Sequence, residues 1–223
     1  MILLVTSCLL AAEVNPAHAA GPELRTDRAF AAIRSNRADA LAWLWTYASN
    51  PDVSQAALQD GTPLVSAHAS WIEADRAAVR GEVDTAIALR RGVGWIDRAW
   101  LAPARPGRND VAALRAVPAA DWRPATASPV GGAFRPAGAL GVRERRAAWL
   151  LVVVEAERPV QTRLRLGTSG RATLVLPGAD PIALPDHDRA GLDQHGFRIR
   201  LPAGRTAVAL HLADEARLGD AIV

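Results

Sequence analysis

The chain contains no lysine and only one cysteine among its 223 residues. All 26 basic residues are arginine, and against 23 acidic residues they leave a formal net charge of +3. Such a small net charge does not indicate a nucleic-acid-binding surface, so no nucleic-acid partner is expected. The cysteine, Cys8, stands near the start. If the first residues of the chain, which include Cys8, are removed, disulfides, thiol nucleophiles and cysteine-ligated metals are excluded.

Long apolar runs are also missing, apart from the first residues. Residues 2–12 are apolar but too short to cross a bilayer. Ala17-His18-Ala19 then has the pattern of a cleavage site, which predicts a signal peptide over residues 1–19 and an exported, periplasmic or extracellular protein. A less favoured alternative is a lipid anchor on Cys8, after Val5-Thr6-Ser7. No transmembrane segment is expected.

Signatures of common enzymes are absent from the sequence. It has no phosphate-binding loop, no dinucleotide fingerprint and no G-x-S-x-G elbow. No cofactor is therefore expected, and the chain is interpreted as non-catalytic.

Helical spacing dominates residues 24–94. Apolar side chains such as Phe30, Ile33, Leu41 and Leu44 recur three and four positions apart. Thr62-Pro63 has the pattern of a helix start, and Gly81 that of a helix end. Residues 24–94 are predicted to form an α-helical, repeat-like domain.

Proline becomes frequent after Gly94, and residues 95–145 are predicted to be a connector with short strands, for example over residues 98–101. Its three indoles, Trp95, Trp100 and Trp122, favour burial against a domain.

Alternating patterns follow over residues 146–223. Residues 147–157 form an apolar run suited to a central strand, and residues 161–168 and 196–204 alternate apolar with arginine. Residues 160–181 are interpreted as a hairpin around Ser169-Gly170. The predicted fold class is therefore multi-domain, with a helical repeat-like domain followed by an antiparallel β-sandwich to which the connector can add strands.

The segment ADRAAVRGEVDTAIAL, residues 74–89, resembles the junction between the two helices of a tetratricopeptide repeat. Gly81, Glu82, Val83 and Asp84 followed by Ala86-Ile87 match the centre of that motif. The resemblance implies a helical hairpin that needs neighbouring helices to cover its apolar face.

The strand region resembles the jelly-roll sandwich of PA14-like and galactose-binding-like domains of secreted bacterial proteins. The similarity is carried by LRLGTSG at 164–170, TLVLPG at 173–178 and DQHGFRIRLPAG at 193–204. It implies a carbohydrate-binding module as one possible function. However, Thr168-Ser169 replaces the family's acidic pair and Pro177 replaces its asparagine, so oxygen ligands for Ca²⁺ or sugar are lost.

Four arginines are the candidate binding residues. Each alternates with apolar residues, so they point away from the core if their segments are strands, and they form a basic patch if those strands are neighbours. Guanidinium groups suit carboxylate, sulfate and phosphate. These residues are Arg163, Arg165, Arg198 and Arg200.

Two acidic or histidine-rich features are weaker candidates. A divalent metal could bind the polar cluster formed by Asp186, His187, Asp188, Asp193 and His195, although its spacing matches no zinc signature. Glu155 and Glu157 face the same side of a strand and could serve acid–base chemistry on a glycosidic bond. An exposed strand end explains that pair more simply.

These patterns favour an exported, non-catalytic interaction or scaffold protein of the bacterial envelope. Its expected partner is a protein or an acidic envelope polysaccharide. The alternatives are a carbohydrate-binding module and a degenerate, glycosidase-associated enzyme fragment.

Overall fold

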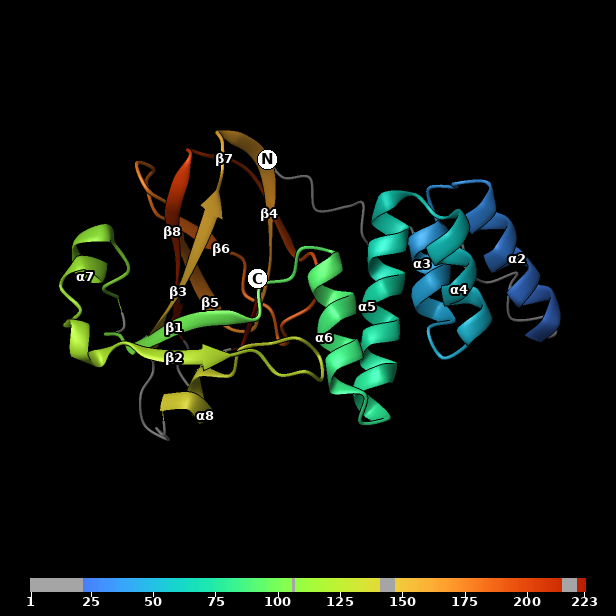
Figure 1. Cartoon of the computed structure of the whole chain (residues 1–223), viewed down its shortest axis with the longest axis horizontal. Helices are drawn as coiled ribbons and strands as arrows, with labels where there is room; N and C mark the ends of the chain where they lie inside the picture. The colour runs from blue at the N-terminus through green and yellow to red at the C-terminus, as the bar shows by residue number, and fades with distance from the viewer. Residues whose placement is uncertain (1–21, 106, 141–146, 214–219) are drawn as a thin grey trace, which may run out of the picture. The chain divides into compact units, whose positions relative to one another are not determined.

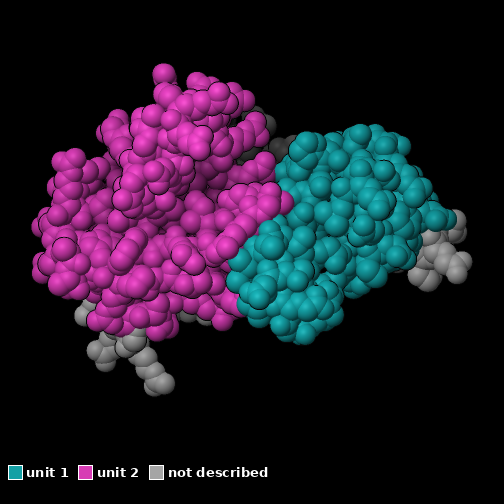
Figure 2. Space-filling view, in the orientation of Figure 1, with its two compact units in different colours: residues 1–89 teal, residues 90–223 magenta. Residues whose placement is uncertain are grey.

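The computed structural model describes residues 22–105, 107–140, 147–213 and 220–223 (Figure 1). Helices fill its N-terminal part and an antiparallel sheet region its C-terminal part, which confirms the coarse fold class. The proposed signal peptide and Cys8 lie outside the described residues. The chain divides into two compact units, residues 1–89 and 90–223, coloured separately in Figure 2.

The first unit is built from helices that follow one another closely. Their bounds are α2 (Pro22–Arg34), α3 (Ala40–Thr46), α4 (Pro51–Asp60), α5 (Pro63–Val79) and α6 (Val83–Gly92), whose last three residues belong to the second unit.

Local signals set the helix boundaries. Asn50 caps α4 by accepting from the backbone N–H of Asp52 at 2.9 Å, and Thr62 caps α5 with Pro63 at its first position. Asn36, with φ of 50°, separates α2 from α3. α4 begins at Pro51 because Asn50 caps it.

The core of the first unit consists of apolar side chains, many of them alanine. Ile33, Leu44 and Val53 are fully buried, with Ala29, Ala57 and Ala69 between them. His68 is buried on α5, and its Nδ1 accepts a hydrogen bond from the indole of Trp45 at 3.0 Å. His68 is thus a core residue whose buried ring has a hydrogen-bond partner.

The second unit contains two antiparallel sheets in the described residues. A six-stranded sheet has the order β2-β1-β3-β8-β5-β6, and a three-stranded sheet the order β7-β4-β9. The strands are β1 (Arg98–Pro103), β2 (Arg123–Thr126), β3 (Ala147–Ala156), β4 (Val160–Thr168), β5 (Arg171–Val175), β6 (Ile182–Leu184), β7 (His195–Leu201), β8 (Gly204–Ala213) and β9 (Ala221–Ile222).

Each sheet has a buried apolar face. In the larger sheet it carries Leu101, Leu150, Leu174 and Leu210, and in the smaller sheet Leu164 and Leu166. The opposite face of the larger sheet is partly covered by residues 104–105 and 107–122, which include α7 (Val111–Arg115) and the 3₁₀ turn η2 (Ala119–Asp121). A further short helix, α8 (Pro136–Leu140), precedes β3.

Residues 160–181 do not form the expected hairpin. β4 pairs with β7 and β9, whereas β5 pairs with β6 and β8. Thr168 and Arg171 therefore stand on either side of a corner where the chain passes from one sheet to the other. The alternating pattern identifies both strands correctly, but alternation says nothing about which strand pairs with which.

Two further expectations need correction. β3 is central, but only its first half is buried on both faces, because Val153 is 38% exposed. Of the three connector indoles, Trp95 is buried and Trp122 half-buried, but Trp100 on β1 is 45% exposed. The described residues include no helix with the length and hydropathy needed to span a bilayer.

Candidate functional site: a basic face on the β4–β7 ribbon

The four candidate arginines come together on one face of the paired strands β4 and β7. Arg163 lies directly opposite Arg198 in the antiparallel register. Arg165 is opposite Gly196, and Arg200 is opposite Gln161. Since residues two apart on a strand share a face, all four side chains belong to the same face, as expected if the strands are neighbours. All four are exposed. We call this surface the basic ribbon face.

Like charges stand opposite each other at the centre of this face. Directly opposite residues on antiparallel strands have Cβ atoms about 4.5–5.5 Å apart, and like charges there destabilise the pair. Among the described residues, no ion-pair partner of Arg163, Arg198 or Arg200 is found. An anion at this position would relieve the repulsion.

Arg165 differs from the other three. Its guanidinium forms an ion pair with the carboxylate of Asp193 in the loop before β7. Its charge is therefore already balanced, which leaves three arginines as the cationic part of the face.

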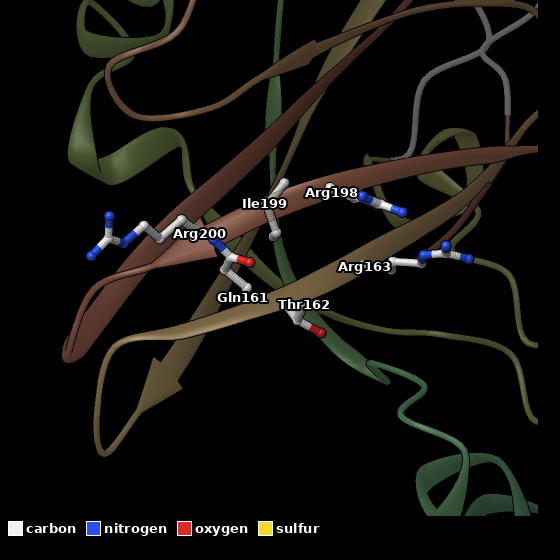
Figure 3. Close-up of a pocket in the computed structure, with 6 residues that line it drawn as sticks. All are labelled: Gln161, Thr162, Arg163, Arg198, Ile199 and Arg200. Atoms are coloured by element: carbon white, nitrogen blue, oxygen red, sulfur yellow. The ribbon is translucent and has the colours of Figure 1, made fainter.

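A hollow of about 530 Å³ adjoins the centre of the ribbon, lined by Gln161, Thr162, Arg163, Arg198, Ile199 and Arg200. Figure 3 shows Arg163 and Arg198 extending in the same direction from neighbouring strands, with Arg200 extending the opposite way. The guanidinium groups are thus spread along the ribbon rather than gathered around one point. Such a surface can hold several anionic groups at once.

The polar residues considered for a metal site pack the loop against the corner at Thr168–Gly170. The backbone N–H of Gly170 donates to the carbonyl of His187 at 2.8 Å, and Asp193 pairs with Arg165. The rings of His187 and His195 lie 5.1 Å apart. The pKa of His195 is lowered mainly by burial of its ring and, to a lesser degree, by the charge of neighbouring His187. Within the described ranges, no three His, Cys, Asp or Glu side chains are grouped so that they could hold a metal ion. No described contact involves the side chains of Asp186 or Asp188.

The corner itself is buried and held on several sides. Thr168 is fully buried, and its backbone N–H donates to the side-chain oxygen of Gln194 at 2.7 Å. Ser169 exchanges two hydrogen bonds with the backbone of Asp220. A Cβ on Gly167 would lie 1.8 Å from the carbonyl oxygen of Gly191. These contacts leave the corner residues no open surface for a ligand.

The Glu155–Glu157 pair lies at the exposed end of β3. Glu155 is opposite Arg205 on β8, and Glu157 follows the strand end. Both are exposed, and among the described residues neither has a hydrogen-bonded partner that would set up acid–base roles. The geometry does not assemble a catalytic pair.

Two features escaped the sequence analysis. Gln194 fixes the corner through Thr168 and through the Arg189 carbonyl, at 2.6 Å. Residues 104–105 and 107–122 form a cover beside a hollow lined in part by Arg105, Arg108 and Trp149. Neither has a local sequence signal, because each depends on residues that are distant along the chain.

No protein-family model matches this chain, and comparison with curated proteins finds no similar one.

Proposed function

We propose that this chain is an exported, non-catalytic interaction protein of the bacterial envelope, and that its basic ribbon face binds an acidic polysaccharide. The observation that carries the proposal is the direct cross-strand opposition of Arg163 and Arg198 without a described ion-pair partner. Arg200 extends the same cationic face. Guanidinium groups bind carboxylate and sulfate in a planar, two-pronged geometry.

The proposal includes the finer architecture. The buried faces of the two sheets support a β-sandwich, since an apolar sheet face needs a second layer to cover it. The α5–α6 turn at Gly81 supports a tetratricopeptide-like helical arrangement in the first unit. In this view the sandwich presents the basic ribbon face, and the helices form an interaction scaffold.

A polymer fits the face better than a small anion. The register pair that carries Arg200 lies two residues along the ribbon from the Arg163–Arg198 pair, which is about 7 Å at about 3.4 Å per residue. The side chain of Arg200 also extends the opposite way from those of Arg163 and Arg198 (Figure 3). A single carboxylate therefore reaches only some of these guanidinium groups, whereas a chain with repeated acidic groups can contact all three arginines that have no described ion pair.

The test is retention on an immobilised acidic polysaccharide in a salt gradient. A variant with glutamine at positions 163, 198 and 200 should elute at distinctly lower salt than the parent protein. The attraction should fade as the Debye length falls from about 10 Å at 0.1 M salt to about 3 Å at 1 M.

The matched control carries glutamine at three exposed arginines elsewhere, namely Arg28, Arg115 and Arg123. It loses the same formal charge, so it should elute close to the parent if the ribbon face is the binding surface. Equal shifts for both triple variants would show a general charge effect and reject the proposal.

A second candidate function, binding of neutral carbohydrate, is favoured by one observation. Trp100 is 45% exposed on the larger sheet, opposite Leu151 in register and on the same face as the 38% exposed Val153. A flat indole on an open sheet face can stack against a sugar ring, because its apolar body and polar N–H suit a partly wet interface. Retention on a neutral polysaccharide, lost on Trp100→Ala and kept in the ribbon variant, would favour this alternative.

A further inference from the structure

Residues 104–105 and 107–122 cover part of the six-stranded sheet. Trp149, Val175 and Ala209 on the sheet pack against Val111, Leu114 and Val117 in this cover. Beside this contact lies a hollow of about 690 Å³ that is open to the surface.

Part of the wall of the hollow is formed by small apolar residues. Ala113, Ala116 and Val117 line it from the cover, and Trp149 lines it from the sheet. Trp149 is almost fully buried and packs edge-on against the ring of His211, with the two ring centroids 4.8 Å apart. The volume is within the range of about 300–1,000 Å³ typical of small-molecule sites.

Two arginines give this apolar space a cationic border. Arg105 and Arg108 both line it, and the Arg108 N–H donates to the Arg105 carbonyl at 3.2 Å. Gly107, beside Arg108, has φ of 74°. Both arginines are exposed, and within the described part of the chain neither forms an ion pair. Asp121 also lines the hollow. Two arginines against one aspartate leave a lining charge of +1.

The border is held in place by the sheet. The Nε2 of His211 lies 3.1 Å from the Arg105 carbonyl, and the side-chain amide of Asn109 donates to the Thr173 hydroxyl at 2.9 Å. Asp110 caps α7 by accepting from the Ala113 N–H at 2.7 Å. Because the backbone around both arginines is fixed in this way, a ligand would not have to order it on binding.

We propose that this hollow binds a small organic monoanion with an apolar body, such as an aromatic or medium-chain carboxylate. The apolar part lies against Ala113, Ala116 and Val117, and the carboxylate meets Arg105 and Arg108. The lining charge of +1 matches one anionic group. This site shares no residue with the basic ribbon face, so either proposal can fail without the other.

The test is a fluorescence titration of the full chain with 8-anilinonaphthalene-1-sulfonate, an apolar monoanion. We expect saturable binding to one site, displaced by octanoate and much less by 1-octanol, which lacks the charge. The double variant Arg105→Gln/Arg108→Gln should bind the probe about tenfold more weakly, since a charge-assisted hydrogen bond contributes on that scale. Equal displacement by octanoate and octanol would overturn the charged part of the proposal.

Two further variants keep the result specific. The control Arg115→Gln/Arg123→Gln removes the same charge from exposed positions that do not line the hollow and should leave the affinity unchanged. Ala116→Phe places a ring at the apolar wall of the hollow and should clearly weaken binding while the far-ultraviolet circular dichroism stays that of the parent. Unchanged probe binding in a folded Ala116→Phe variant, or equal weakening in the control, would overturn the site.

Discussion

His211 shows how one buried polar side chain organises its surroundings. It is almost fully buried on β8, packs edge-on against Trp149 and reaches the Arg105 carbonyl at 3.1 Å. A carbonyl oxygen can only accept, so the Nε2 of His211 must carry the proton in this bond. Burial lowers the pKa of His211, and the bond to the Arg105 carbonyl opposes that effect to a lesser degree.

This lowered pKa predicts a pH-dependent stability. The unfolded chain binds a proton at this imidazole more readily than the folded chain. The contribution of neutral His211 to the free energy of unfolding is therefore fully present above about pH 6.5, and it is lost as the pH falls through the folded-state pKa. The variant His211→Gln keeps an N–H donor but cannot titrate. Between pH 7.5 and pH 5, its thermal midpoint should fall less than that of the parent in calorimetry. His195, whose pKa is also lowered, titrates in both proteins and cancels. Parallel curves would contradict the assignment.

Arg90 shows what residue patterns cannot predict. Its position near the end of α6 suits the helix dipole, which suggests an exposed side chain. In the structure it is fully buried, donates to the Pro129 carbonyl and lies 5.5 Å above the ring of Trp95. The indole of Trp95 in turn donates to the Gly132 carbonyl at 2.9 Å. The two carbonyls are 39 residues from Arg90 and 37 residues from Trp95, so no local spacing could reveal these contacts.

At the scale of elements, the end of α5 follows directly from the sequence. The Gly81 N–H donates to the Ala78 carbonyl at 3.0 Å and the Glu82 N–H to the Ala77 carbonyl at 2.9 Å, which is the Schellman arrangement. Gly81 has φ of 84°, where a side chain is strained even though no neighbouring atom lies within 4 Å of its Cβ position. Glycine is needed here because it adopts a positive φ without strain, and not because a side chain would clash with a neighbour.

The variant Gly81→Val should therefore destabilise the helical unit by on the order of 1–2 kcal/mol. Urea unfolding followed by circular dichroism measures the change. Gly92→Val is the matched control, because Gly92 is exposed, has ordinary φ and has open space around its Cβ position. If both variants unfold like the parent, the strain argued at Gly81 is absent.

Strand positions were easier to predict than strand partners. Alternation located β4 and β7 closely and placed the arginines on one face. It failed at Ser169-Gly170, where turn residues suggested a hairpin and the chain instead changes sheets. That outcome depends on Gln194, Gly191 and Asp220, which hold the corner from other parts of the chain. Pairing is a non-local property, and a pattern of period two does not contain it.

At the scale of the whole molecule, the two units have separate apolar cores. Leu44 is fully buried in the first, among helices α2 to α5, and Leu174 is fully buried in the second, on β5. α6 nevertheless runs through the unit boundary without a break, from Val83 to Gly92. The separate cores favour independent unfolding of the two units, whereas the continuous helix favours unfolding of both together. Packing favours the cores, because burial of apolar area outweighs the stability of a single helix of this length.

Leu44→Ala should accordingly destabilise the first unit by about 2–5 kcal/mol, through lost burial and the cavity it leaves. Native-state hydrogen exchange should show faster opening over residues 26–89 and unchanged protection in β3 and β8. Leu174→Ala should give the reverse pattern. Retention on the acidic polysaccharide should survive Leu44→Ala under folding conditions, since the basic ribbon face belongs entirely to the second unit. If each variant instead lowers protection equally in both units, the continuous helix couples them into one cooperative structure, and the division into independently stable parts is wrong.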